Sequence, residues 1–279
     1  MIDLHTHSSA SDGQYSPAGL MRLAAARGLT AIALTDHDTV AGIPEAQSTA
    51  QALGIRFLPG IEISVKAPVR ELHLLGYRIN PECPELLEMC AWFQEQRRIR
   101  EKRIFSYLAA RGVRLEREQV ERLAEKGLVG RPHFARAMVE AGYVATAREA
   151  FDKHLAVPEF YAIERPKPTP EAGIRCILAA GGVPVLAHPV QLNLSSEQLD
   201  HFVGELKAAG LAGIECYYST HTPKQTQEYL FLAEKYGLTV TGGSDFHGEE
   251  VKPEIQLGSG INGSLHIEDA EILHWEDTP

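Results

Sequence analysis

Short apolar runs rich in β-branched residues recur along the chain, and most of them end in polar residues. They lie at residues 2–7, 31–37, 57–65, 71–77, 183–189, 213–218 and 238–247. Between most of these runs lie amphipathic patterns with helical spacing, at residues 16–28, 43–54, 169–182, 196–210 and 222–237. Several helical segments begin with Ser or Thr followed by Pro and end in Gly, which are start and stop signals of helices. The pattern predicts seven strands that mostly alternate with helices.

Strands that alternate with helices indicate a parallel sheet or barrel of the α/β class. Because no Gly-x-Gly-x-x-Gly fingerprint is present, a barrel of six to eight strands is favoured over an open doubly wound sheet. Residues from about 80 to 168 break the alternation and predict successive helices at 84–112, 117–127 and 131–142, without a strand. We therefore predict a barrel formed by residues 1–80 and 168–279, with an inserted helical subdomain at residues 81–167.

The chain has 279 residues, of which 44% are hydrophobic, and a formal net charge of −10. The charge is unevenly spread, because residues 97–136 hold 12 Lys or Arg and only 5 Asp or Glu. An acidic body suits a site that holds cations, and a basic segment suits an anionic substrate. A solvated helical face with salt bridges is the alternative interpretation of the basic segment. The negative net charge argues against stable binding of duplex nucleic acid.

Cysteine usage and hydropathy bear on the location of the protein. No run of eighteen apolar residues is present, so we predict no transmembrane helix and no membrane partner. The first residues lack the basic and apolar regions of a secretory signal. Four cysteines without a Cys-x-x-Cys pair fit a reduced protein with free thiols. We expect a cytoplasmic protein, and the sequence leaves its oligomeric state open.

Histidines and carboxylates gather at the predicted strand ends. His5 and His7 project to the same side of the first strand, about 7 Å apart, and Asp12 follows in the next loop. The other residues of this kind, in or at the ends of different strands, are His37, Glu62, His73, His188, Asp245 and His247. Active sites of parallel barrels lie at the C-terminal ends of the strands. Any one of the nine alone fits an ordinary core or surface residue, but together they predict a metal centre.

The donor set indicates the kind of metal. His, Asp and Glu ligands without Cys suit divalent ions such as Mn²⁺, Zn²⁺ or Fe²⁺. Nine ligands are too many for one ion and enough for two or three. Glu62 is the only Glu in the set, and we predict that it bridges two ions. We therefore expect two to three divalent metal ions, with Mn²⁺ as the first candidate.

Five motifs follow one another along the chain. They are His-x-His-(x)4-Asp-Gly at residues 5–13, Thr-Asp-His-Asp at 35–38, Gly-Ile-Glu-Ile at 60–63, Ala-His-Pro at 187–189 and Gly-Ser-Asp-Phe-His at 243–247. With these motifs, the chain resembles the PHP (polymerase and histidinol phosphatase) phosphoesterases over almost its whole length. The resemblance implies a distorted seven-stranded β/α barrel, a TIM-like fold, with a trinuclear metal centre.

The resemblance also implies which residues share an ion. His5, His7, Glu62 and Asp245 would hold the first ion, Glu62, His73 and His188 the second, and Asp12, His37 and His247 the third. Some family members have His where this chain has Asp12, so the third site is expected to bind less tightly or to prefer a harder ion. Beside His37, we interpret Asp36 as a partner that orients an imidazole, and Asp38 as a carboxylate at a helix N-terminus.

Within the family, Arg131-Pro-His133-Phe-Ala-Arg136 and Ser219-Thr-His221 resemble a subgroup of stand-alone enzymes. Its members hydrolyse the 3′-phosphate of nucleoside 3′,5′-bisphosphates or remove nucleotides from the 5′ ends of RNA. The resemblance implies a bidentate grip on phosphate by Arg131. The further substrate-binding residues in these motifs are His133, His221 and Arg136. Ser9, a loop hydroxyl after the first strand, is also expected to contact phosphate. The alternatives are a salt bridge at a helix start for Arg131 and a solvent-facing position for Arg136.

The predicted catalytic residues are Glu62, Asp245 and His221, and the predicted nucleophile is hydroxide activated by metal. We expect a metal-dependent phosphoesterase that acts on phosphate monoesters of nucleotides. Its substrates are predicted to be nucleoside 3′,5′-bisphosphates, AMP-like nucleotides or the 5′ ends of short RNA. The alternatives are a histidinol-phosphate phosphatase, a non-catalytic metal-binding module and an amidohydrolase. An amidohydrolase usually needs a lysine at a strand end, where this chain has Glu62.

Overall fold

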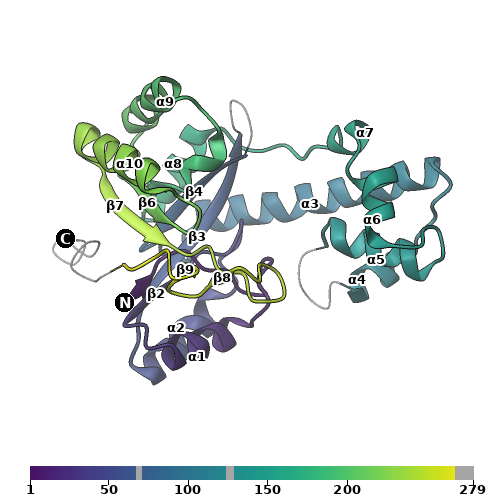
Figure 1. Cartoon of the computed structure of the whole chain (residues 1–279), viewed down its shortest axis with the longest axis horizontal. Coiled ribbons are helices and arrows are strands. Elements are labelled where there is room, and N and C mark those ends of the chain that lie inside the picture. The colour runs from purple at the N-terminus through teal and green to yellow at the C-terminus, as the bar shows by residue number, and fades with distance from the viewer. Residues whose placement is uncertain (67–70, 124–128, 268–279) are drawn as a thin grey trace. The chain divides into compact units, whose positions relative to one another are not determined.

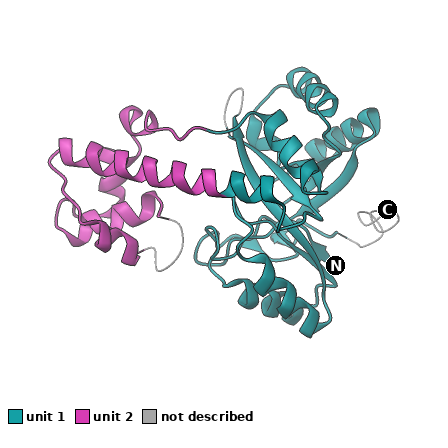
Figure 2. Ribbon diagram, turned by 180° about the vertical axis from the view of Figure 1, so that it is seen from behind, with its two compact units in different colours: residues 1–90, 167–279 teal, residues 91–166 magenta. Residues whose placement is uncertain are grey.

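The computed structural model describes residues 1–66, 71–123 and 129–267. The chain forms two compact units, residues 1–90 with 167–279 and residues 91–166, which Figure 2 shows in different colours. The first unit contains all the described strands, and the second contains helices. The long helix α3 (Pro84–Ala110) begins in the first unit and continues in the second.

A seven-stranded sheet forms the centre of the first unit, with the strands in the order in which they follow along the chain. They are β1 (Ile2–Asp3), β2 (Ala31–Leu34), β3 (Arg56–Lys66), β4 (Glu71–Tyr77), β5 (Val183–Leu186), β6 (Gly213–Tyr218) and β7 (Thr239–Gly243), most of them labelled in Figure 1. The segment after β1 pairs with the end of β7 and with the segment that follows it, since Leu4 N–H donates to the Gly242 carbonyl and Thr6 forms a parallel β-bridge with Phe246. This pairing brings the first and last strands together, and the predicted seven-stranded α/β barrel is confirmed.

One strand departs from the predicted parallel arrangement. β4 is antiparallel to both β3 and β5, whereas the other neighbouring pairs are parallel. Only residues 67–70 separate β3 from β4 in the sequence. A parallel connection needs a crossover of about a dozen residues or more, so strands this close in sequence run antiparallel. The reversal places His73, near the start of β4, at the edge where the parallel strands end.

Four predicted strands extend too far at their C-terminal ends. The runs at residues 2–7, 31–37, 183–189 and 238–247 were predicted as strands throughout, but the strands end at Asp3, Leu34, Leu186 and Gly243. The polar residues that follow include Asp38, His188 and Asp245, whose φ angles are 58°, 24° and 59°. Positive φ angles are incompatible with a strand. Most of the candidate site residues therefore follow the strands and do not belong to them.

Helices of the first unit lie along the outside of the sheet (Figure 1). They are α1 (Pro17–Ala26), α2 (Ile43–Leu53), α8 (Pro170–Ala179), α9 (Ser196–Ala208) and α10 (Pro223–Tyr236). The 3-10 helix η2 (Pro189–Leu192) follows β5, and a small pair of strands, β8 (Ile255–Gln256) and β9 (Gly260–Ile261), follows β7. The side chains of Ser16, Thr169 and Thr222 cap α1, α8 and α10 as predicted. Gly237 ends α10 in the left-handed conformation that favours glycine.

The barrel interior and the layer beneath the helices are separate parts of the core. Ala31 and Ala33 of β2 pack inside the barrel with residues of the other strands, such as Leu75. The alternate residues Ile32 and Leu34 pack outward in a second cluster with residues of α1 and α2. Because both faces of the strand are buried, its sequence is apolar throughout.

The second unit is built around its own core. Its elements are the C-terminal part of α3, α4 (Arg117–Leu123), α5 (Arg131–Glu140), α6 (Ala147–Ala150), the π-helical turn η1 (Phe151–Leu155) and α7 (Pro158–Tyr161). The largest buried side chains of this core are Phe134 and Phe160. Residues 124–127 of the helix predicted at 117–127 lie outside the described residues. No helix in the described part of the chain is long and apolar enough to cross a membrane.

Candidate metal centre

The nine predicted metal ligands converge on one region of the barrel unit. Their nitrogen and oxygen atoms form four groups, and within each group the atoms lie within 4.8 Å of one another. The groups are His7, Asp12, His37 and His247; His5, His7 and Asp245; His5, Glu62 and His188; and His37, Glu62 and His73. Glu62 and His73 lie on β3 and β4, and the others follow β1, β2, β5 and β7. Segments that are far apart in sequence therefore supply a single cluster of imidazoles and carboxylates.

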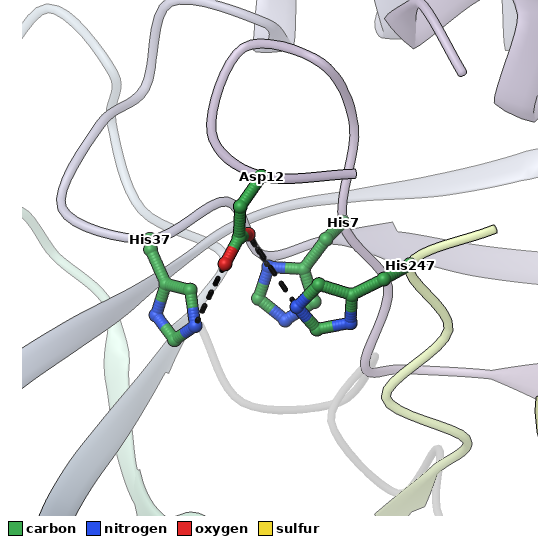
Figure 3. A group of neighbouring side chains, drawn as sticks. All are labelled: His7, Asp12, His37 and His247. Atoms are coloured by element: carbon green, nitrogen blue, oxygen red, sulfur yellow. Dashed lines mark ion pairs between the residues drawn. The ribbon is translucent and has the colours of Figure 1, made fainter. Parts of the chain in front are cut away.

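Figure 3 shows the group around Asp12. The Asp12 carboxylate, on the loop after β1, faces the imidazoles of His7, His37 and His247 at oxygen–nitrogen distances of 3.7, 3.9 and 3.4 Å. A Cβ atom at Gly13 would lie 2.3 Å from the carbonyl oxygen of His7. Glycine at this position lets the loop fold back against His7, so that Asp12 returns to the cluster. The Asp12 side chain is 45% exposed and is therefore the ligand most open to solvent.

Buried hydrogen bonds hold the N-terminal segment in place. The Asp3 carboxylate accepts hydrogen bonds from the N–H and the hydroxyl of Ser244, at 2.8 and 2.6 Å, and from the N–H of Gly258 at 2.8 Å. Next to Ser244, a Cβ atom at Gly243 would lie 2.3 Å from the Cβ of His5. The end of β7 and the segment that carries His5 are therefore in close contact, and the N-terminal residues are part of the barrel.

Glu62 lies at the centre of the cluster. Its Oε1 is 2.9 Å from both Nδ1 of His73 and Nε2 of His188. Its Oε2 lies 3.3, 3.2 and 3.1 Å from ring nitrogens of His5, His7 and His37. Burial alone would raise the pKa of Glu62, but the imidazoles around it hold the pKa well below its usual value. The two oxygens of an ionised carboxylate thus face different sets of imidazoles, as in a carboxylate that bridges two ions.

The geometry of the cluster fits divalent metal ions. Several of its atoms are buried and have no hydrogen-bond partner among the described residues: Nε2 of His5, Nδ1 and Nε2 of His7, Nδ1 of His37 and Oε2 of Glu62. A buried polar atom without a partner costs free energy. Ligands that bind one ion at about 2.1 Å lie about 3.0 to 3.4 Å from each other in octahedral or tetrahedral geometry, close to the distances around Glu62. Metal ions would therefore satisfy these atoms.

A buried carboxylate that the sequence analysis missed orients two of the histidines. Oε1 of Glu215, on β6, accepts a hydrogen bond from Nδ1 of His5 at 2.9 Å. Its Oε2 accepts from the backbone N–H of His188 at 2.6 Å. The first bond leaves Nε2 of His5 directed at Glu62 and Asp245. Glu215 is the only charged residue in the predicted strand 213–218. Because a buried charge needs a partner, the sequence already indicated that Glu215 pairs with a polar group.

Asp245 is held by two residues to which the sequence analysis gave no role. Its Oδ2 accepts hydrogen bonds from the Tyr218 hydroxyl and from Nζ of Lys252, each at 2.8 Å. Its Oδ1 faces His7 at 3.2 Å and His247 at 3.3 Å. Burial raises the pKa of Tyr218, and the charge of Asp245 acts in the same direction. The hydroxyl therefore stays protonated and donates a hydrogen bond to Asp245. One oxygen of Asp245 is thus positioned by the protein, and the other faces the cluster.

The roles predicted for Asp36 and Asp38 are wrong. The Asp36 carboxylate accepts hydrogen bonds from the N–H and hydroxyl of Ser8 and from the hydroxyl of Ser11, at 2.6 to 2.7 Å, and so pins the loop after β1. Asp38 does not cap a helix, because α2 begins only at Ile43. Its carboxylate accepts from the N–H and hydroxyl of Ser64. Both carboxylates therefore bind backbone and hydroxyl groups of adjacent segments, and Asp36 makes no hydrogen bond to His37 in the described part of the chain.

His221 follows β6 in the barrel unit. Its Nδ1–H donates to the carbonyl of Cys216 at 2.9 Å, and its Nε2 is buried with no hydrogen-bond partner in the described part of the chain. Burial lowers the pKa of His221, which favours the neutral imidazole. Its Nε2 is therefore ready to accept a hydrogen bond, and protonation of a leaving group is disfavoured. Ser9 is partly buried in the loop after β1, where its N–H donates to the carbonyl of Tyr15.

The three other predicted substrate-binding residues lie on α5 in the second unit. Arg131 is exposed, and its Nη1 donates to the Tyr161 hydroxyl at 3.3 Å. Nδ1 of His133 accepts from the N–H of Gly130 at 2.9 Å and so stabilises the start of the helix. Arg136 is exposed. Arg131 and Arg136 both present a guanidinium group that an anion can reach, whereas His133 has a structural contact.

A barrel with buried imidazoles and carboxylates at the edge where its parallel strands end has the architecture of a metal-dependent hydrolase. The model of the PHP domain family matches residues 3–247. The chain therefore belongs to the PHP domain family, as its motifs predicted.

Three relatives are similar to the chain over most of its length. A 5′-3′ exoribonuclease of Haemophilus influenzae is 35% identical over 277 residues, which cover 98% of this chain and 97% of that protein. A 3′,5′-nucleoside bisphosphate phosphatase of Chromobacterium violaceum is 33% identical, with coverage of 88% and 87%. A solved structure from Bifidobacterium adolescentis, described as a metal-dependent phosphoesterase, is 34% identical with a TM-score of 0.78 and coverage of 93% and 91%. The predicted resemblance to the subgroup of nucleoside bisphosphate phosphatases and RNA 5′-end nucleases is confirmed.

Proposed function

We propose that this protein removes phosphate groups from nucleotides, with two or three divalent ions held by the nine residues of the cluster. The chain is a metal-dependent phosphoesterase by its family and its relatives. The choice of nucleotides rests on the relatives, a bisphosphate phosphatase and exoribonucleases. The substrates that we propose are nucleoside 3′,5′-bisphosphates, AMP-like nucleotides and the 5′ ends of short RNA.

The observation that carries the proposal is the position of Glu62, whose two oxygens face different sets of imidazoles. Bound divalent ions supply a Lewis acid that activates water and neutralises charge on a phosphoryl group. The residues of the chain fix the geometry around them. Glu62 and Asp245 hold the ions from the barrel, and Nε2 of His221 accepts a hydrogen bond from substrate or water. Arg131 binds a substrate phosphate through its guanidinium group.

The test measures, over a panel of substrates, phosphate release from nucleoside 3′,5′-bisphosphate, AMP and histidinol phosphate, and nucleotide release from 5′-phosphorylated RNA, each with added Mn²⁺ and after chelation. We expect Glu62→Gln to lose bound metal and to lower activity more than about a hundredfold. Mutation of a residue that only hydrogen-bonds to a metal ligand already lowers metal affinity or activity about 10- to 100-fold. The control is Glu71→Gln, at the exposed start of β4. Unchanged metal content and activity in Glu62→Gln would contradict the proposal.

The panel also separates the alternatives. A preference for histidinol phosphate would overturn the choice of nucleotides and leave the phosphoesterase intact. A non-catalytic module would release neither phosphate nor nucleotide from any substrate, although all nine candidate ligands are in place. Metal analysis of the purified protein tests Mn²⁺, which we propose because the oxygen ligand Asp12 suits a hard ion. We propose a cytoplasmic location, which fits the four free cysteines.

A further inference from the structure

The second unit contains a cavity of its own. Residues of α3, α4 and α5 and of the segment after α7 line it. Its volume is about 430 Å³, within the range of about 300 to 1,000 Å³ that is usual for small-molecule sites. Five of the lining residues are arginines: Arg97, Arg98, Arg100, Arg117 and Arg165. Only Glu101 and Glu121 oppose them, so the lining carries a net charge of +3.

Contacts with the rest of the unit hold several of these guanidinium groups in place. Nε of Arg100 donates to the carbonyl of Ile163 at 2.8 Å. The Arg165 guanidinium lies over the ring of Phe93, 5.5 Å from its centre. Nε of Arg117 is 2.7 Å from a carboxylate oxygen of Glu121. Guanidinium groups that are already positioned lose little entropy when they bind an anion.

The arginines are also crowded. Burial lowers the pKa of Arg100, and the positive charges of Arg165, Arg131 and Arg97 act in the same direction. Arg131 is the residue to which the sequence analysis assigned a phosphate contact. Repulsion among like charges is unfavourable in the free protein, and an anion in the cavity would relieve it.

The lining is not uniformly charged. Ile104, Val129 and Phe134 contribute apolar surface beside the arginines. A ligand that matches both parts carries a negative charge and an apolar ring system. A nucleotide has this combination, because its phosphate pairs with arginine and its base packs on apolar or aromatic groups. An inorganic phosphate ion would use only the charged part of the cavity.

We propose that this cavity binds a nucleotide unit of an oligoribonucleotide substrate, other than the unit that carries the reacting phosphate. The inference rests on the proposed function, because it assumes a phosphorylated nucleotide substrate. A nucleoside bisphosphate has a single nucleotide unit, whereas a short RNA has further units that the cavity can hold. The cavity therefore increases affinity for RNA and does not affect a mononucleotide.

The test compares two double variants on the same helix. Arg97→Gln with Arg98→Gln removes two positive charges from the cavity. Lys102→Gln with Arg103→Gln removes two positive charges from exposed positions of α3 that do not line it. The full-length chain is titrated by fluorescence anisotropy with 5′-phosphorylated oligoribonucleotides of two to eight nucleotides. Their phosphorothioate links resist hydrolysis, so binding is measured without turnover. The second readout is the KM for a nucleoside 3′,5′-bisphosphate.

We expect the cavity variant to raise the Kd for the longer oligonucleotides about tenfold and to leave the KM for the bisphosphate unchanged. The slope of log Kd against log salt falls by about 1 to 2, because two phosphate contacts are lost. The Kd of the control variant for the same oligonucleotides should lie within about twofold of the wild-type value. Circular dichroism and thermal unfolding check that both variants fold, and Arg117→Gln, on α4, is a second probe of the cavity.

Equal RNA affinity in the cavity and control variants would overturn the inference. An equal loss for the mononucleotide and the longer RNA would also overturn it, because the cavity would then bind the reacting nucleotide. Failure of the proposed function has a different signature, namely neither phosphate release from any nucleotide nor nucleotide release from RNA by the wild type. The binding comparison does not depend on that result.

Discussion

At the scale of single residues, Glu215 determines which nitrogen of His5 faces the cluster. Its carboxylate accepts one hydrogen bond from His5 and one from the N–H of His188. In Glu215→Gln the amide has only one acceptor oxygen, so one of these buried donors loses its partner. We expect metal affinity to fall about 10- to 100-fold, as measured by competition with a chelator of known affinity. Glu205→Gln, at an exposed position of α9, is the control and should bind metal like the wild type.

The comparison of Glu215→Gln with the wild type also separates a role of Glu215 in positioning His5 from a role in stabilising the fold. If Glu215 only stabilised the fold, Glu215→Gln would lower the unfolding temperature and leave the metal affinity of the folded protein unchanged. That result would contradict the positioning role. A loss of metal affinity without a matching loss of thermal stability in the chelated protein would support it.

The site could be read from the sequence only in part. The nine clustered residues were predicted because strand-end motifs mark positions that a barrel brings together. Glu215, Tyr218 and Lys252 were missed because each acts through a tertiary contact, with His5, His188 or Asp245, that no local spacing reveals. Asp36 and Asp38 were assigned from their proximity to His37 in sequence, although their side chains bind other segments.

At the scale of elements, the contact between β7 and the N-terminal segment sets the position of the ligand His5. A Cβ atom at Gly243 would lie 2.3 Å from the Cβ of His5 and 2.4 Å from its backbone nitrogen. Gly243→Ala must therefore displace the segment that carries His5. We expect a loss of about 1 to 3 kcal/mol in the free energy of unfolding, as for other overpacked cores, together with lower metal affinity. Denaturant unfolding and metal titration measure the two effects.

Gly130→Ala is the matched control, because a Cβ atom there meets no atom closer than 3.6 Å and its φ of −126° suits any residue. It should leave metal binding unchanged. Wild-type stability and metal affinity in Gly243→Ala would show that the two segments can separate without disturbing the site, and would contradict a structural role for their close packing.

The strands themselves were predictable because apolar runs buried on both faces are distinctive. The direction of β4 was not predicted, because strands were assumed to alternate with helices. Only four residues separate β3 from β4, which is too few for a helical crossover between parallel strands. The C-terminal ends of four strands were also misplaced. Residues such as His188 leave the strand conformation at a positive φ, a feature that depends on contacts from other strands.

At the scale of the whole molecule, charge is divided between the two units. Residues 91–166 contain 15 Lys or Arg and 11 Asp or Glu, in a chain whose net charge is −10. The barrel unit is therefore strongly acidic and contains the buried carboxylates Glu62, Asp245 and Glu215, whereas the helical unit is basic and contains the arginine cavity. Metal cations suit the first unit, and phosphate anions suit the second.

This division predicts that metal ions stabilise one unit and not the other. Bound ions would satisfy the buried polar atoms of the barrel, and a ligand at 100 times its Kd stabilises the folded state by about 2.7 kcal/mol. Chelation should therefore lower the unfolding temperature of the barrel unit by about 5 to 10 °C, and Mn²⁺ should restore it. Hydrogen exchange locates the effect: amides of residues 2–7 and 243–247 should lose protection on chelation, whereas those of α5 should not. Equal loss of protection in α5 would mean that the two units unfold together and that the metal centre stabilises the whole chain.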